Sequence, residues 1–141
     1  MSEAPKVSRP LPTPDDPLVV EFWEHCNRGE LCFQRCQNCG IWRHLPRFVC
    51  ARCGSDRWGW APSSGRGRIF SWTITHQPLV RGFPEPVPYA VVVVELDEGG
   101  RMVSGLRELE PPQLALDLPV EVVFETVADG VRMPFFRPRT P

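Results

Sequence analysis

Two Cys-x-x-Cys pairs, separated by ten residues and each followed directly by a glycine, are the part of this chain best suited to chemistry. Thiolates at this spacing converge from two short turns on one tetrahedral metal ion, and a glycine can take the positive φ that closes such a turn. Four thiolates suit Zn²⁺, with iron of the rubredoxin kind as the competing ion. We therefore expect a structural Zn²⁺ whose ligands are Cys36, Cys39, Cys50 and Cys53.

Disulfide bonds and a redox dithiol are the alternatives for these cysteines. Disulfides need an oxidising compartment, and the first residues contain no apolar segment that would direct export. A redox dithiol normally uses one pair rather than two matched pairs. The sequence thus favours a metal site in a cytoplasmic protein. Cys26 and Cys32 lie outside the pattern, and we interpret them as buried apolar thiols, although Cys32 is close enough to Cys36 to replace a ligand.

Charge is distributed unevenly along the chain, although its formal net charge is only −1. Residues 28–68 carry a net +6, whereas residues 1–27 carry −3 and residues 69–141 carry −4. Four thiolates with one Zn²⁺ have a formal charge of −2, so part of the basic excess offsets the metal site. The remainder is compatible with an anionic ligand, a nucleic acid or an acidic partner surface.

Histidines are the other residues that could carry chemistry, but none stands in a nucleophile–base pattern. His44 lies between the cysteine pairs, and because four cysteines complete a closed site we expect it at the surface. His76 is expected on the polar face of the first barrel strand, a face where such barrels bind ligands. We predict no catalytic residue. We expect the tryptophans to serve packing rather than base stacking; they are Trp42, Trp58, Trp60 and Trp72.

The elements that hold the cysteines are mostly short. A proline-rich segment, 1–14, is expected to be a disordered arm, and Asp16 with Pro17 predicts a helix within 15–30 that ends near Gly29. Residues 31–61 are expected to form a rubredoxin-like zinc ribbon that depends on its metal for stability.

From residue 65 to 138 the pattern becomes that of β-strands. Alternation over 68–77 predicts a strand with Phe70, Trp72 and Ile74 on one face. Residues 89–96 are predicted to form a strand that is buried on both faces and pairs with 101–106 in a hairpin. A second hairpin is predicted from 119–127 and 131–136. The sequence therefore predicts a mainly β protein that ends in a five-stranded antiparallel OB-fold barrel, with an SH3-like barrel or small sandwich as the structural alternative.

The chain also resembles a known family over residues 16–138. The resemblance rests on the helix with Phe22 and Trp23, on both cysteine pairs and on several short segments, namely Gly29-Glu30-Leu31, Ser64-Gly65-Arg66-Gly67, Glu95-Leu96-Asp97-Glu98-Gly99 and Pro119-Val120-Glu121-Val122. In this respect the chain is similar to the acyl-CoA-associated zinc-ribbon/OB-fold proteins, known as domain of unknown function 35 (DUF35).

The resemblance implies an accessory subunit that adds no turnover by itself. Its partner would be a thiolase-like enzyme of the lipid-transfer-protein type, such as a lipid or steroid aldolase, or a MaoC-like hydratase. The chain would then be part of a hetero-oligomer and would help to shape a CoA-thioester site. The four paired cysteines would bind Zn²⁺, and basic residues around the ribbon and the first barrel loop would contact the partner or the CoA phosphates. No membrane association is implied.

Two other functions compete with this one. A single-stranded nucleic-acid-binding protein would also combine a ribbon, a barrel and a basic region, but the negative charge of the barrel segment opposes a polyanion. A rubredoxin-like electron carrier would bind iron in the same cysteines, and its visible colour would distinguish it from a zinc protein.

Overall fold

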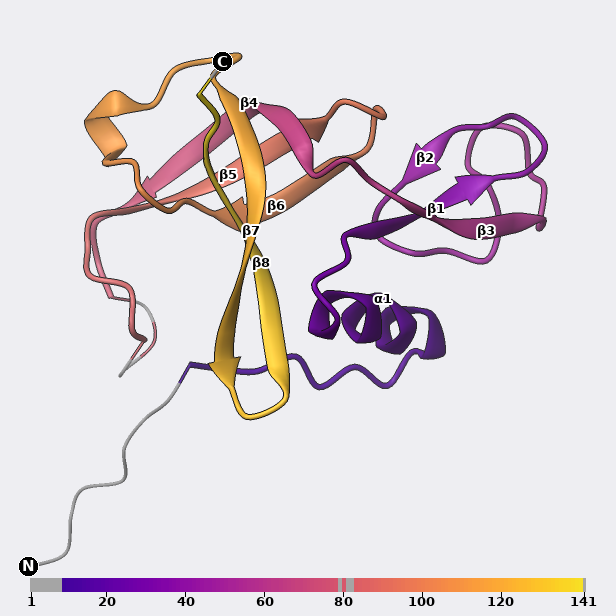
Figure 1. Ribbon diagram of the computed structural model, residues 1–141, viewed down its shortest axis with the longest axis horizontal. Helices are drawn as coiled ribbons and strands as arrows, with labels where there is room; N and C mark the ends of the chain where they lie inside the picture. Colours follow the sequence, from indigo (N-terminus) through magenta and orange to yellow (C-terminus); the bar gives the residue numbers. More distant parts are fainter. Residues whose placement is uncertain (1–8, 79, 81–82, 141) are drawn as a thin grey trace, which may run out of the picture.

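The computed structural model describes residues 9–78, 80 and 83–140. The expected disordered arm therefore lies, for residues 1–8, outside the described residues. One α-helix, eight strands and a short 3₁₀-helix follow in the order α1 (Pro17–Asn27), β1 (Cys32–Cys36), β2 (Trp42–Arg43), β3 (Trp58–Pro62), β4 (Arg66–Thr75), β5 (Tyr89–Leu96), β6 (Arg101–Gly105), η1 (Pro111–Gln113), β7 (Pro119–Ala128) and β8 (Val131–Pro138). Figure 1 shows the small sheet of the ribbon beside the larger barrel sheet, with α1 below the ribbon.

Helix α1 begins and ends where the sequence predicts. The side chain of Asp16 accepts a hydrogen bond of 2.9 Å from the backbone N–H of Leu18, and Pro17 occupies the first helical position. Gly29, at φ +75°, ends the chain reversal after the helix. Phe22 is 3% exposed and packs against Phe33 of β1, so the apolar face of this short helix is covered by the chain itself.

The ribbon is a three-stranded antiparallel sheet in the order β2-β1-β3. Gln34 of β1 is fully buried, and its Oε1 accepts hydrogen bonds of 2.7 Å from the Nε of Arg43 and from the backbone N–H of Arg47. These bonds fold the segment after β2 back over the sheet. They therefore fix the loop that connects the two cysteine pairs.

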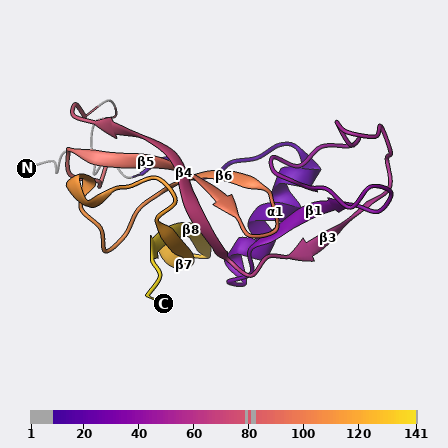
Figure 2. The same cartoon turned by 90° about the horizontal axis from the view of Figure 1, so that it is seen from above.

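The second sheet has five antiparallel strands in the order β6-β5-β4-β7-β8. A parallel bridge between Leu106 and Phe136 joins its two ends, and the backbone N–H of Arg107 donates to the carbonyl of Phe136 at 2.7 Å. The strand order and this closure are those of an OB-fold barrel, which confirms the predicted fold class. Figure 2 shows the elongated arrangement, with the barrel at one end and α1 with the ribbon at the other.

Two strand predictions were wrong in detail. A β-bulge in β4 lies between Ile69 and Ser71, so Phe70 turns outward and is 43% exposed while Ile69 is buried. Its ring instead packs under the guanidinium of Arg101, 3.8 Å from the ring centroid. Strand β5 is buried on one face only, because its even-numbered residues are buried and its odd-numbered residues are half-buried.

One apolar core connects the two parts of the molecule. Phe22, Leu31 and Phe33 from the helix and ribbon belong to the same buried cluster as Val92, Phe136 and other barrel residues. The linker between ribbon and barrel, which contains Ser63 and Ser64, is also fixed by hydrogen bonds. The carboxylate of Glu98 accepts from the backbone N–H of Ser64 at 2.7 Å and from the hydroxyl of Ser63 at 2.8 Å. The ribbon is thus packed against the barrel.

Candidate metal centre and adjoining pocket

The four paired cysteines come together at one end of the ribbon. Cys36 is the last residue of β1 and Cys39 lies in the turn after it, while Cys50 and Cys53 flank a second turn. Each turn is closed by the following glycine, whose N–H donates to the carbonyl of the first cysteine of its pair, at 3.0 Å in the first turn and 2.8 Å in the second. Both glycines have positive φ, at +78° and +75°, as the sequence predicted.

The sulfur positions fit a metal ion. The Sγ atoms of Cys36 and Cys53 are 3.6 Å apart, as are those of Cys39 and Cys50, and all four lie within 4.8 Å of one another. Tetrahedral zinc with Zn–S bonds of about 2.3 Å separates its sulfurs by about 3.8 Å. A disulfide would require about 2.05 Å. The four cysteines are therefore positioned for metal binding.

The backbone of the turns favours the thiolate form that a metal requires. The backbone N–H groups of Cys39 and Asn38 lower the pKa of Cys36 to about 6, against the opposing effect of desolvation. In the second turn, the backbone N–H of Cys53, helped by that of Arg52, lowers the pKa of Cys50. In each turn, the backbone N–H groups thus stabilise the thiolate of the first cysteine, which is the form that binds a cation.

The other two cysteines are separate from this cluster. Cys26 and Cys32 are both buried, and desolvation, together with the nearby Cys32, raises the pKa of Cys26 to about 12. Neither belongs to the four-sulfur group, and both are buried as expected.

The predicted surface position of His44 was wrong. Its ring is half-buried between two aromatic rings, with centroids 4.8 Å from that of Phe22 and 5.4 Å from that of Phe33. Its Nδ1 has no hydrogen-bond partner among the described residues. Desolvation lowers the pKa of His44 to about 4, so the ring is neutral at pH 7. His76 is exposed just beyond the end of β4 and lies outside the pocket described next.

A pocket of about 850 Å³ lies beside the ribbon. Its walls come from helix α1, the loop after β2, one side of the barrel with the adjoining loops, and Arg9. Representative lining residues are Phe22, Trp23, Leu45, Val103, Met133 and Phe135. The lining is mostly apolar, which suits a hydrocarbon or an apolar protein side chain better than a polyanion.

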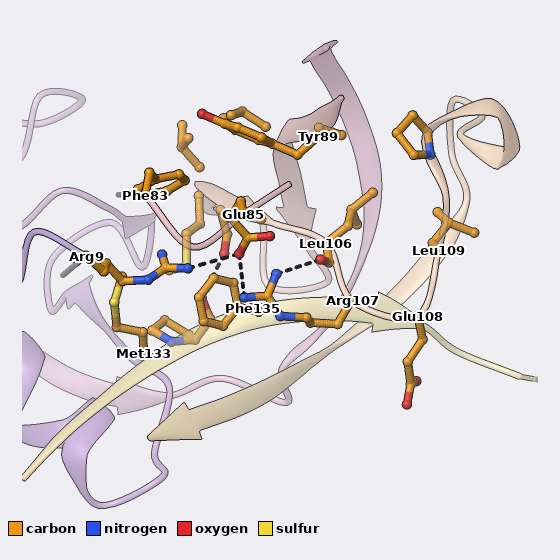
Figure 3. A pocket seen from close by; sticks show the side chains of 18 of the residues that line it. Arg9, Phe83, Glu85, Tyr89, Leu106, Arg107, Glu108, Leu109, Met133 and Phe135 are labelled. Carbon is orange, nitrogen blue, oxygen red and sulfur yellow. Dashed lines mark hydrogen bonds and ion pairs between the residues drawn. The ribbon is translucent and has the colours of Figure 1, made fainter. Parts of the chain in front are cut away.

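An ion-pair cluster forms the polar end of this pocket. Glu85 Oε1 lies 2.9 Å from Arg9 and 2.8 Å from Arg107, and Arg107 also binds both carboxylate oxygens of Glu125, at 2.7 and 2.8 Å. Figure 3 shows the guanidinium groups of Arg9 and Arg107 directed at Glu85, beside the ring of Phe135. Sequence reasoning missed this cluster, because its four charged members come from four segments with no common motif.

Large apolar side chains are exposed on the ribbon next to the pocket. Between the two cysteine pairs, within residues 41–49, four are at the surface: Ile41, Leu45, Phe48 and Val49. Leu45 also lines the pocket, so the exposed segment and the pocket are continuous. Exposed apolar side chains gathered in one segment are typical of a surface that binds another protein.

Two of the basic residues of the ribbon serve local structure. Arg35 stacks on the ring of Trp42, and Arg43 is tied to Gln34 and to the carbonyl of Arg47. Arg52 and Arg57 are exposed. Arg81, the basic residue of the first barrel loop, lies outside the described residues.

Comparison with known proteins agrees with this architecture. Residues 23–59 match a family described as the ChsH2 rubredoxin-like zinc ribbon domain, and residues 60–125 match the ChsH2 C-terminal OB-fold domain. A DUF35 domain-containing scaffold protein of Methanothermobacter thermautotrophicus is 31% identical over 79% of this chain and 84% of its own length. This chain belongs to the DUF35 family.

Two further relatives are similar over nearly the whole chain. A probable enoyl-CoA hydratase alpha subunit of Thermomonospora curvata is 33% identical over 99% of the chain, but the chain spans only 43% of that relative's length. A solved structure described as an Ltp2-ChsH2(DUF35) aldolase contains a chain that is 30% identical, with a TM-score of 0.80, covering 89% of this chain and 98% of that one. Among the described residues of our chain, no helix is long and apolar enough to cross a bilayer.

Proposed function

We propose that this DUF35 chain is a non-catalytic accessory subunit of a thiolase-like enzyme that acts on CoA thioesters of lipids or steroids. The observation that carries the proposal is the near-complete match to the DUF35 chain of the Ltp2-ChsH2 aldolase, combined with the exposed apolar segment 41–49. The match supports a thiolase-like enzyme as the partner. The exposed segment supplies a surface to which that enzyme could bind.

In this proposal, Cys36, Cys39, Cys50 and Cys53 bind one Zn²⁺ with a structural role. The separation of their sulfurs and the lowered pKa of Cys36 support these ligands. Four protein ligands leave no open coordination position, so the ion stabilises the ribbon and takes no part in chemistry. The proposal divides the chain into a helical segment (15–30), a ribbon (31–61) and a barrel (65–138). It also places the protein in the cytoplasm, where a reducing environment keeps cysteines free to bind metal.

The pocket is our candidate for the place where this subunit contributes to its partner's acyl-CoA site. It is apolar, and through Leu45 it adjoins the segment that would meet the partner. An acyl group that extends beyond the partner's own site would bury its hydrocarbon here, and each buried methylene contributes about 0.8 kcal/mol. The CoA thioester would then be shared between the two subunits.

A second candidate function is the accessory part of a MaoC-like enoyl-CoA hydratase. It is favoured by the relative named as a hydratase alpha subunit, which matches 99% of this chain. Both functions use the same surfaces and differ only in the enzyme that is bound.

Size-exclusion chromatography with light scattering distinguishes them. The purified chain is mixed in turn with a thiolase-like enzyme and with a MaoC-like hydratase from the same genome, and the mass of each mixture is measured. We expect a stable hetero-oligomer with the thiolase-like enzyme. A complex with the hydratase alone would favour the second function, and separate elution from both enzymes would reject both.

A further inference from the structure

A second group of metal-binding side chains lies where α1 leads into β1. His25, Glu30 and Cys32 place a ring nitrogen, a carboxylate oxygen and a thiol sulfur within 4.8 Å of one another. The Nδ1 of His25 is 3.2 Å from Oε2 of Glu30. Nitrogen, oxygen and sulfur are all donors that Zn²⁺ accepts, and ligand atoms of one ion are commonly separated by about 3–4 Å.

The backbone between these residues is held in a fixed reversal. The N–H groups of Arg28 and Glu30 both donate to the carbonyl of His25 at 3.0 Å, and Gly29 at φ +75° turns the chain back toward the helix. Cys32 then begins β1, where it pairs with Pro62 of β3. The three donors are therefore brought together by the fold.

The ring of His25 is held in place by packing against a neighbouring side chain. It lies against the indole of Trp60, with centroids 5.4 Å apart, and the Nε1 of Trp60 donates to Glu21 of the same helix at 2.6 Å. The side chain of His25 is only 19% exposed. A ligand ring that is fixed by neighbours in this way loses little conformational entropy when it binds a metal.

A cation already lies beside the contact between His25 and Glu30. The Nη2 of Arg28 is 3.0 Å from the Nδ1 of His25, and its Nε is 3.6 Å from Oε2 of Glu30. The guanidinium thus lies against two of the three atoms that would bind a metal ion. Because the Arg28 side chain is 55% exposed, it can move into water when a more strongly bound cation enters.

We propose that His25, Glu30 and Cys32 form a second site, for Zn²⁺ or a similar divalent transition-metal ion, which competes with Arg28. The site has three protein ligands and, beside the half-exposed Glu30, a fourth position open to water. The open fourth position distinguishes this second site from the four-cysteine site, in which protein ligands occupy all four positions. Binding of the ion releases the proton of Cys32, so affinity increases with pH.

Titration of the metal-free full-length chain with Co²⁺ tests the proposal. We expect two equivalents to bind: one with the absorption of a four-thiolate site, and one that binds more weakly with the weaker charge-transfer band of a single thiolate. His25→Ala changes a side chain that is 19% exposed and Glu30→Gln one that is 52% exposed. Each is expected to abolish the second equivalent and preserve the first. A single equivalent in the unmodified chain would overturn the proposal, as would a second equivalent that both variants retain.

Arg28→Gln provides a test in the opposite direction. Removal of the competing cation is expected to tighten binding of the second equivalent by about tenfold. Glu24→Gln, an exposed substitution on the same helix, serves as the matched control and should leave both equivalents unchanged. If Arg28→Gln left the affinity of the second equivalent unchanged, the ion pair of Arg28 would be purely structural and the site would be rejected.

Discussion

The carboxylate of Glu98, in the turn between β5 and β6, accepts a 2.7 Å hydrogen bond from the backbone N–H of Ser64. Ser64 lies in the linker from ribbon to barrel, so this bond joins the linker to a barrel hairpin. Burial raises the pKa of Glu98, but the hydrogen bonds from Ser64 and Ser63 outweigh it and leave the pKa below its ordinary value of 4.5. The charged form of Glu98 therefore stabilises the attachment of the ribbon.

Glu98→Gln is expected to lower the free energy of unfolding by about 1–3 kcal/mol at pH 7, because a charge-assisted acceptor is replaced by a weaker one. Since the folded-state pKa is lowered, the contribution of Glu98 is present above pH 4.5 and decreases below it. Urea denaturation at neutral pH measures the effect. Glu108→Gln, which changes an exposed carboxylate with no ion pair or hydrogen bond among the described residues, is the control. Equal stability of Glu98→Gln and wild type would show that the linker is held by packing alone.

Cys53→Ser should remove one ligand of the proposed zinc site and unfold the ribbon. We expect a loss of the four-thiolate metal equivalent and a destabilisation of more than about 4 kcal/mol, because the ribbon has little core of its own. Metal analysis and a circular dichroism melt measure both quantities. Cys32→Ser should preserve the four-thiolate equivalent. A Cys53→Ser protein with unchanged metal content and melting would refute the ligand assignment.

Acid should destabilise the protein through His44. Its pKa is lowered by burial from 6.5 to about 4, so the unfolded state binds the proton first as pH falls. The contribution of the neutral ring is complete above pH 6.5 and is lost between pH 6.5 and about 4. Between about pH 7.5 and 5.5, we expect a loss of about 1.3 kcal/mol.

His44→Phe retains an aromatic ring between Phe22 and Phe33 and removes the titration. The pH dependence of its unfolding free energy should therefore be flatter than that of the wild type. In the wild type, the ring resonances of His44 in an NMR titration should not shift across pH 6.5. A midpoint near 6.5 would mean that the ring is exposed to solvent.

Gly67 of β4 leaves no room for a side chain. A Cβ at this position would collide with the carbonyl oxygen of Glu95 and with Val94 on the paired strand β5. Backbone cannot move aside as a flexible side chain can, so Gly67→Ala is expected to cost about 2–4 kcal/mol. Gly99→Ala meets no neighbouring atom within 4 Å, and its cost should be limited to the strain of its positive φ. Thermal melts that ranked Gly99→Ala as the more harmful substitution would contradict this packing.

The sequence predicted the elements whose signals are local. Asp16 and Pro17 marked the start of α1, the two cysteine pairs marked the ribbon turns, and Asp129-Gly130 marked the turn between β7 and β8. In each case, a few adjacent residues determine the backbone.

Features that depend on contacts between distant residues could not be predicted in the same way. Phe70 was expected on the same face as Trp72 and Ile74 because strict alternation does not reveal a bulge. His44 was expected at the surface because its burial depends on the hydrogen bond from Arg47 to Gln34, which folds the loop inward. The cluster of Arg9, Glu85 and Arg107 joins three segments and left no pattern in the sequence.

Binding of the thiolase-like enzyme through the segment 41–49 is the central claim, and Phe48 is the residue that tests it. Its side chain is 68% exposed, so Phe48→Asp should leave the fold intact. Leu116→Asp changes a side chain that is 66% exposed on the barrel connector, and it serves as the matched control. The dissociation constant of the complex is measured by isothermal titration calorimetry for the wild type and both variants.

The account predicts that Phe48→Asp weakens binding by at least about thirtyfold, corresponding to about 2 kcal/mol, while Leu116→Asp binds as the wild type does. Equal affinities of the wild type and Phe48→Asp would contradict it.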